Sequence, residues 1–203
     1  MLRVGITGGI GSGKTAVCRV FETLGVILYY ADAEVKRLYS ENSDLKSKLH
    51  SAYGPSVLES GEINKVFLRT VAFGSEEASQ KLNSLVHPFV FEHYEKWCEA
   101  HKKQAYTLKE AAILFESGSY RRVQKAIGVV APVELRIERV MRRDNCSRED
   151  VLRRMQKQMP QDELAAKCHY IVQNDENHSI VEQVRSLHKK LLADSAMTWP
   201  YMA

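Results

Sequence analysis

Hydrophobic and polar positions along the chain form two kinds of pattern. Short apolar runs rich in β-branched residues are typical of buried strands, and five of them stand at residues 2–7, 26–32, 106–115, 126–132 and 170–174. Longer stretches between them repeat apolar residues three and four positions apart, which is the spacing of amphipathic helices. Strands that alternate with helices predict an α/β fold, with a five-stranded parallel sheet and helices on both faces.

The first helix is expected directly after the first apolar run, over residues 16–25. Its apolar positions share one helical face and are Val17, Val20, Phe21 and Leu24. Gly25 follows them at a position where helices commonly end. The chain therefore opens with a strand, a glycine-rich turn and a helix.

The interval between the second and third apolar runs, residues 33–104, is much longer than a crossover connection needs. Because a structureless loop of this length is uncommon in a compact domain, we expect a small helical subdomain here. One helical face within it is apolar and consists of Leu82, Leu85, Val86, Phe89 and Val90. Pro88 lies inside this pattern and predicts that the helix kinks or restarts there.

A second interval, residues 133–168, is helical in pattern and rich in arginine. Its residues 134–158 carry seven arginines and one lysine against five acidic residues. The first helix of this interval is expected to have an apolar face opposite an arginine face, made respectively of Ile137, Val140, Met141 and of Arg136, Arg139, Arg143. Such arginines could belong to a lid that closes over a triphosphate or to a solvated helix face.

The second helix of this interval is expected to begin at a capping box formed by Ser147 and Asp150. Its inward positions are expected to be Leu152, Met155 and Met159, and its outward ones Arg154 and Gln158. The two helices would form a hairpin whose arginines turn away from the core.

Composition narrows the class of protein. With 203 residues and 44% hydrophobic residues the chain can bury a core, which excludes a disordered protein. A net charge of +4 is weak for a nucleic-acid-binding protein of this size, so an anionic small ligand fits better.

Four cysteines without a CxxC pair indicate reduced thiols and the cytoplasm. No apolar run approaches the ~20 residues of a membrane span, and the early glycine cluster leaves no room for a signal peptide.

The glycine-rich turn, GGIGSGKT at residues 8–15, matches the phosphate-binding pattern GxxxxGK[ST]. Glycines allow successive backbone N–H groups to turn toward a phosphate, and the N-terminus of the following helix adds a positive dipole end. Lys14 is expected to reach the β- and γ-phosphates, and the Thr15 hydroxyl to coordinate Mg²⁺. A turn that merely joins strand to helix is the alternative, but the strand before and the helix after the motif favour a nucleoside triphosphate site.

Several other residues allow more than one interpretation. Asp32 closes the second apolar run, where it could accept the proton of an attacking hydroxyl or cap the next helix. His87, before Pro88, could be structural or functional. Glu116 could lie near Mg²⁺, bind substrate or cap a helix. The adjacent charges at 109 and 110 indicate either a short third strand or a functional carboxylate near the nucleotide.

Seven segments taken together resemble the dephospho-coenzyme A kinase family. In chain order they are GITGGIGSGKT (residues 5–15), AD (31–32), LNSLVHP (82–88), ILFESG (113–118), RVMRRD (139–144), RRMQKQMP (153–160) and IVQN (171–174). The resemblance covers almost the whole chain, in order and at matching spacings. It implies a P-loop kinase that uses MgATP to phosphorylate the ribose 3′-hydroxyl of dephospho-coenzyme A, the last step of coenzyme A synthesis.

The resemblance also implies roles for individual residues. The ATP-binding positions would be Gly9, Gly11, Ser12, Gly13, Lys14, Thr15 and Ala16, with Arg139, Arg143 and Arg154 as lid arginines near the phosphates. Asp32 would be the catalytic base, and it would share the acceptor site with His87, Pro88 and Glu116. Lys14, Arg139 and Arg143 would act with Asp32 in catalysis.

The implied fold has three layers and three parts. These are a nucleotide-binding core of residues 1–32, 105–132 and 169–203, a helical acceptor subdomain of residues 33–104 and a lid of residues 133–168. The family usually has proline at position 112, Asp-Ala-Asp at 30–32, Ala-Asp at 168–169 and apolar residues at 109–110. This chain has Ala112, Tyr30-Ala31-Asp32, Cys168-His169 and Lys109-Glu110.

Other functions remain open at the level of sequence. A nucleoside monophosphate kinase or another small-molecule kinase would use the same layout. A GTP-dependent switch would need NKxD and DxxG motifs, and NKVF at residues 64–67 lacks the aspartate. A binding module without chemistry would leave Asp32 and the arginine-rich helices unexplained.

Overall fold

The structure is a computed structural model that describes residues 1–198. Residues 199–203, the end of the range expected to complete the core, lie outside the described residues. The chain forms two compact units. One consists of Met1–Tyr30 and His101–Ala203, and the other of Ala31–Ala100.

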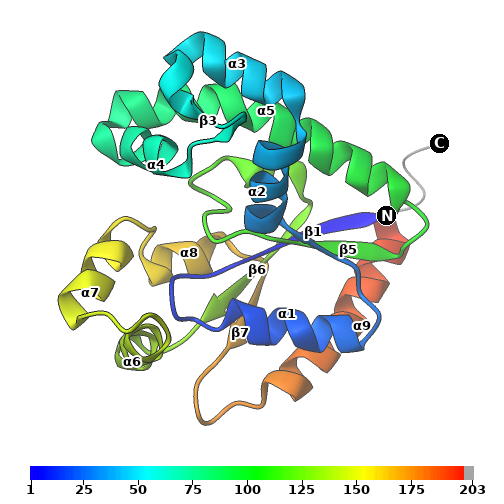
Figure 1. Cartoon of the computed structure of the whole chain (residues 1–203). Helices are drawn as coiled ribbons and strands as arrows, with labels where there is room; N and C mark the ends of the chain where they lie inside the picture. The colour runs from blue at the N-terminus through cyan, green and yellow to red at the C-terminus, as the bar shows by residue number, and fades with distance from the viewer. Residues whose placement is uncertain (199–203) are drawn as a thin grey trace. The chain divides into compact units, whose positions relative to one another are not determined.

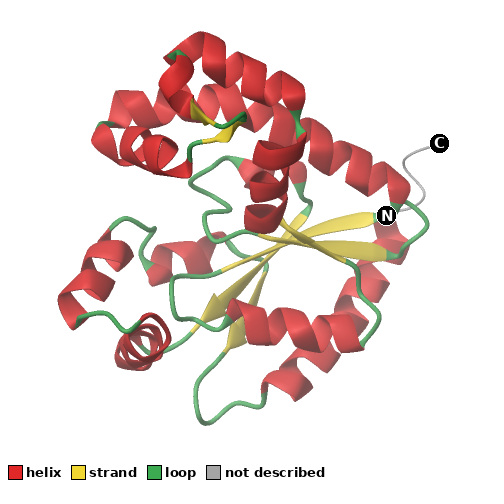
Figure 2. Cartoon of the chain, in the orientation of Figure 1, coloured by secondary structure: helices red, strands yellow, loops and turns green. Residues whose placement is uncertain are grey.

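The first unit is built on a five-stranded parallel sheet, which confirms the predicted fold class (Figure 2). Its strands are β1 (Leu2–Thr7), β2 (Leu28–Tyr30), β5 (Tyr106–Glu110), β6 (Lys125–Val130) and β7 (Tyr170–Gln173). The strands lie in the order β2-β5-β1-β6-β7, and every neighbouring pair is parallel. The strand that precedes the glycine-rich turn is therefore the central one.

Helices cover both faces of this sheet. Successive residues of β6 are directed to opposite faces and show which helices lie on each. Ile127 and Val129 belong to the cluster buried with α1 (Lys14–Thr23) and α9 (Ile180–Thr198), two helices that pack side by side (Figure 1). Gly128 points the other way, toward α8 (Gln161–Lys167), where a Cβ would lie 3.3 Å from Leu164. The period-two alternation of strand side chains thus positions the two helical layers.

The third strand is shorter than its predicted range of 106–115. β5 ends at Glu110, and the chain then turns, with Ser117 donating a backbone hydrogen bond to Ile113. Leu114, expected within the strand, is fully buried over Gly5 of β1, where a glycine leaves room for it. The apolar run therefore continues as a partly buried loop, in which Leu114 packs on the sheet and Ile113 is exposed. A short 3₁₀ helix, Ser119–Arg122, follows this loop.

The arginine-rich interval contains α6 (Val133–Asp144), α7 (Arg148–Gln156) and α8. Ser147 and Asp150 form the predicted capping box at the start of α7. Two predicted orientations are wrong, because Arg136 is only 5% exposed and Leu152 is 37% exposed. Val151 is the buried residue of α7, and it packs with Ile137 and Val140. Met155, predicted to face inward, does pack against this cluster, so the inward face of α7 runs through Val151 and Met155 and excludes Leu152.

Gln158 and Met159 lie beyond the end of α7, so the helical periodicity used to orient them does not apply. The prediction that Gln158 faces outward is also wrong. Its side-chain carbonyl accepts a hydrogen bond from the backbone N–H of Ile10 in the glycine-rich turn.

The second unit is mainly helical and has its own core. Its helices are α2 (Ala31–Glu41), α3 (Ser43–Tyr53), α4 (Lys65–Gly74) and α5 (Glu76–Ala100), with a 3₁₀ turn (Pro55–Val57) and an antiparallel hairpin of β3 (Leu58–Glu59) and β4 (Glu62–Ile63). The predicted apolar face of α5 is confirmed, since Leu82, Val86 and Val90 are buried in this core. α5 is 25 residues long and continues through Pro88, so the predicted restart does not occur.

Among residues 1–198, none of the helices combines the length and the apolar character that crossing a membrane would require.

Candidate active site

The glycine-rich turn of residues 8–15, called the phosphate loop below, joins β1 to α1. Gly11 and Gly13 have φ angles of 77° and 86°, in the left-handed region that favours glycine. Gly13 stands at the N-cap of α1, and the first turn of that helix has no acidic residue. The positive end of the helix dipole is therefore directed to the loop without a competing carboxylate.

Side chains around the phosphate loop leave no space for larger residues in place of its glycines. A Cβ at Gly9 would lie 2.8 Å from the guanidinium carbon of Arg136, and one at Gly13 would overlap the amide nitrogen of Asn174. The loop is thus packed from outside by two polar side chains. The sequence motif explains the glycines by phosphate binding alone, and the structure adds this second reason.

Lys14 and Thr15 occupy the first turn of α1. The Lys14 ammonium donates a 2.7 Å hydrogen bond to the carbonyl of Gly8, which folds this cation back over the loop. Thr15 and Ala16 are exposed, whereas Ser12 is completely buried. The structure thus brings a lysine, a threonine hydroxyl and a helix N-terminus together at one end of the central strand.

Arg139 of α6 approaches the same loop through Asn174. Its guanidinium donates hydrogen bonds of 3.2 and 3.4 Å to the backbone and side-chain oxygens of Asn174. Asn174, which is 6% exposed, donates in turn to the carbonyl of Ser12. Sequence reasoning gave Asn174 no role, although its place directly after the last strand, at the ligand-facing edge of a parallel sheet, was an available signal.

Arg143 and Arg154, predicted as separate lid arginines, meet on one carboxylate. Arg143 donates hydrogen bonds of 2.7 and 3.0 Å to Asp144, and Arg154 donates one of 2.7 Å to the same side chain. Hydrogen bonding and charge from the two guanidinium groups lower the pKa of Asp144 to about 2. Asp144 therefore stays ionised at physiological pH and holds both arginines, a role that sequence reasoning missed.

Glu116 lies in the loop that follows β5. Its carboxylate accepts a 3.0 Å hydrogen bond from the backbone N–H of Met159, just beyond α7. The structure therefore brings Glu116 into contact with the arginine-rich interval, between α7 and α8.

The remaining predicted residues belong to the second unit. Asp32 is an exposed residue in the first turn of α2, two residues after β2 ends. It lies inside the helix and not at its cap. In the first turn its negative charge interacts favourably with the helix dipole. His87 and Pro88 lie near the middle of α5, and the His87 ring is 5.4 Å from that of Phe91.

The charged pair in the third strand belongs to the sheet. Lys109 is fully buried, its Nζ lies 5.8 Å from the centre of the Tyr29 ring, and β5 pairs with both β1 and β2 at this level. Behind the phosphate loop, burial and then the charge of Glu110 raise the pKa of the Cys18 thiol to about 12. The third strand therefore carries a fully buried charged side chain within the sheet.

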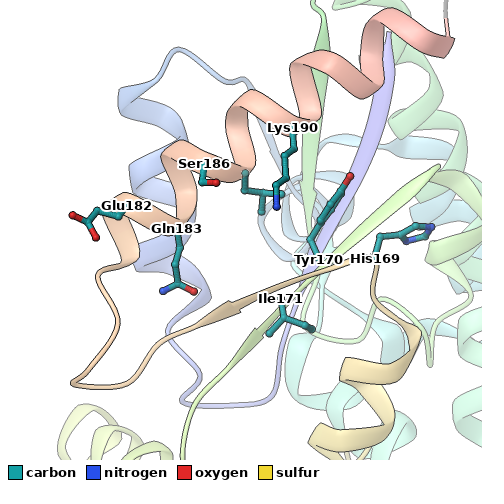
Figure 3. Close-up of a pocket in the computed structure, with 8 residues that line it drawn as sticks. His169, Tyr170, Ile171, Glu182, Gln183, Ser186 and Lys190 are labelled. Carbon is teal, nitrogen blue, oxygen red and sulfur yellow. The ribbon is translucent and has the colours of Figure 1, made fainter.

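A separate open hollow of about 500 Å³ lies between β7 and α9 (Figure 3). Its lining includes Tyr170 and Ile171 of the strand and Gln183 and Lys190 of the helix. Its residues include none of the phosphate loop, so it is distinct from the site described above.

A parallel sheet, a phosphate loop after its central strand and arginines from a helical hairpin define the P-loop kinases as the class of this protein. The family model for dephospho-CoA kinase matches residues 2–179. The chain therefore belongs to the dephospho-CoA kinase family, and its reaction is the final step of coenzyme A biosynthesis.

A curated relative and two solved structures are similar to this chain. A dephospho-CoA kinase from Bacteroides fragilis is 36% identical over 187 residues, which cover 92% of this chain and 91% of that protein. A crystal structure of a protein from Thermus thermophilus superposes with a TM-score of 0.80 at 29% identity, covering 95% of this chain and 97% of the other. A dephospho-CoA kinase structure from Campylobacter jejuni shares the fold, with a TM-score of 0.70 at 23% identity and coverage of 95% and 98%.

Proposed function

We propose that the chain uses MgATP as the phosphoryl donor and that the residues described above carry out the steps of phosphoryl transfer. The phosphate loop is the observation that carries this proposal. Its glycines at positive φ, the Lys14 ammonium and the dipole of α1 form a cradle suited to a triphosphate. Gly13 has a φ of 86° and a Cβ there would overlap Asn174, so the loop offers backbone groups and no side chain at this position.

In this proposal Lys14 holds the β- and γ-phosphates, and Thr15 is a ligand of Mg²⁺. The ion, when bound, neutralises the charge that develops on the phosphate oxygens during transfer. Gly9, Gly11, Ser12, Gly13 and Ala16 complete the nucleotide contacts through the backbone or by packing.

Arg139, Arg143 and Arg154 supply further positive charge to the transferring group. The arrangement of Arg139 on Asn174, and of the other two on Asp144, supports this assignment because the guanidinium groups are oriented before substrate binds. Charge neutralisation and positioning matter most here, since phosphoryl transfer passes through a loose transition state.

Asp32 accepts the proton of the ribose 3′-hydroxyl and orients that oxygen toward the γ-phosphate. His87, Pro88 and Glu116 contribute to the acceptor site. The acceptor is the small molecule dephospho-coenzyme A and not a nucleic acid, and the reaction takes place in the cytoplasm.

Turnover of dephospho-coenzyme A with MgATP tests the proposal, beside AMP as a competing acceptor. We expect Asp32→Asn to lower kcat by about 100-fold or more, within the usual range for general base catalysis, with little change in ATP affinity. Lys14→Ala should abolish turnover.

Asp44→Asn is the matched control for Asp32→Asn, because Asp44 is also an exposed acidic residue in the first turn of a helix, α3. A fall in ATP affinity equal to the fall in kcat would remove Asp32 from the role of base, and a preference for AMP would contradict the acceptor.

A further inference from the structure

Arg136 lies where the sequence pattern did not predict it. This residue of α6 is 5% exposed, and its Nε donates a 3.0 Å hydrogen bond to the backbone carbonyl of Ile10 in the phosphate loop. The carbonyl carbon and Cα of Arg136 would each lie 3.0 Å from a Cβ at Gly11. The middle of the phosphate loop therefore rests directly on this arginine.

The Arg136 side chain is itself held by a second polar residue. Its Nη1 donates a 3.3 Å hydrogen bond to the side-chain carbonyl of Gln161, the first residue of α8. The same oxygen accepts a 3.1 Å bond from the backbone N–H of Ala131, just after β6. Gln161 thus fixes the guanidinium against the end of β6.

Ile10 is also held from its other side. Its backbone N–H donates a 2.8 Å hydrogen bond to the side-chain carbonyl of Gln158. Both polar groups of the Ile10 backbone are therefore bound by side chains from the arginine-rich interval, one from α6 and one from the segment after α7. Two bonds of this kind restrict the rotation of the peptide groups on either side of Ile10.

We propose that Arg136 is a positioning residue for nucleotide binding, which together with Gln161 and Gln158 orients the peptide groups of the phosphate loop toward the phosphates. This inference rests on the proposed role of that loop. Arg136 differs in this respect from Arg139, Arg143 and Arg154, because it binds the backbone of the phosphate loop itself and has no proposed contact with the substrate. The arginine fork matters as well as the charge, since one nitrogen binds Ile10 while another binds Gln161.

Equilibrium binding of ADP and ATP, measured by calorimetry, tests this proposal together with the KM for each substrate. Arg136→Gln and Arg136→Lys should each weaken nucleotide binding by about 10-fold to 100-fold, because each loses a charge-assisted or bidentate contact. The KM for dephospho-coenzyme A should change less than about threefold. Arg142→Gln is the matched control, since it removes the same charge from an exposed position of the same helix and should leave binding unchanged.

Gln161 provides a second pair of variants should the Arg136 variants fail to fold. Gln161→Leu removes the acceptor for Arg136 and should weaken nucleotide binding, whereas Gln161→Glu retains an acceptor and should restore most of it. Wild-type nucleotide affinity in Arg136→Gln, or in Gln161→Leu if only that variant folds, would overturn the proposal. So would full rescue by Arg136→Lys, or equal increases in both KM values. Because ADP binding needs no acceptor, these results stand even if dephospho-coenzyme A is not turned over.

Discussion

The side-chain amide of Asn174 donates a 2.7 Å hydrogen bond to the backbone carbonyl of Ser12, across 162 positions of sequence. Arg139 binds the two oxygens of the same asparagine. The end of the last strand, the phosphate loop and an arginine of α6 therefore share one polar connection, in which the Asn174–Ser12 bond is buried. Each group in it depends on the others for its orientation, because unpaired polar groups are costly to bury.

We expect Asn174→Ala to lower the free energy of unfolding by about 1–3 kcal/mol, since it leaves the buried Ser12 carbonyl without its donor. The KM for ATP should rise. Asn174→Asp should raise that KM further, because a carboxylate cannot donate to Ser12 and places negative charge beside the phosphate site. Thermal unfolding and steady-state kinetics measure both effects, and unchanged ATP kinetics in Asn174→Asp would show that the connection does not shape the loop.

Gly13→Ala should abolish detectable nucleotide binding. Its φ of 86° is strained for alanine, and the added Cβ would overlap Asn174. Gly25→Ala is the control for backbone strain without a steric clash. Gly25 has a φ of 78°, but open space surrounds its Cβ position. This control should lose only about 1–2 kcal/mol of stability and keep its ATP affinity. Similar ATP binding by the two variants would contradict the steric argument.

The capping box of α7 is expected to stabilise the hairpin locally. Ser147→Ala removes the hydroxyl that accepts from the backbone N–H of Asp150, a loss of about 0.5–2 kcal/mol. Hydrogen exchange of the α7 amides should accelerate accordingly. Ser51→Ala is a suitable comparison, since that hydroxyl only donates to a carbonyl inside α3 and its loss should leave exchange in α7 unchanged.

His169 should make stability depend on pH. The backbone N–H of Ala126 donates to its Nδ1, and burial, assisted by the charge of Lys125, lowers the pKa of His169 below its ordinary value. The unfolded chain therefore takes up the proton first as the pH falls. The stabilising contribution is complete above about pH 7 and is lost progressively below about pH 6.5.

Tm measured from pH 8 to pH 5.5 tests this contribution. The wild type should lose more Tm over that range than His169→Asn, because the asparagine side chain keeps an acceptor for Ala126 but does not titrate. Parallel curves would assign the pH dependence to other groups.

Most of the fold could be predicted from the sequence, because period-two and period-3.6 patterns report which short segments bury one face. The phosphate loop was equally readable, since its residue types and its strand and helix neighbours are all local. Two of the predictions that were wrong depend on packing against other parts of the chain. Leu114 looked like part of a strand, yet it is buried over Gly5. The helix does not restart at Pro88, since α5 is continuous and its apolar face packs into the core of the second unit.

The sequence by itself determined the order of elements, the phosphate loop and the family, because these depend on residue types at short spacing. Only the tertiary structure decided what the polar side chains do. Arg136 falls on the stripe of Val140 and binds Ile10, while Arg143 and Arg154 share Asp144. Helical periodicity states which residues share a face, but it does not state which partner each side chain meets. Packing between segments decides this, because Ile10 lies 126 positions from Arg136 and Asp144 lies 10 positions from Arg154.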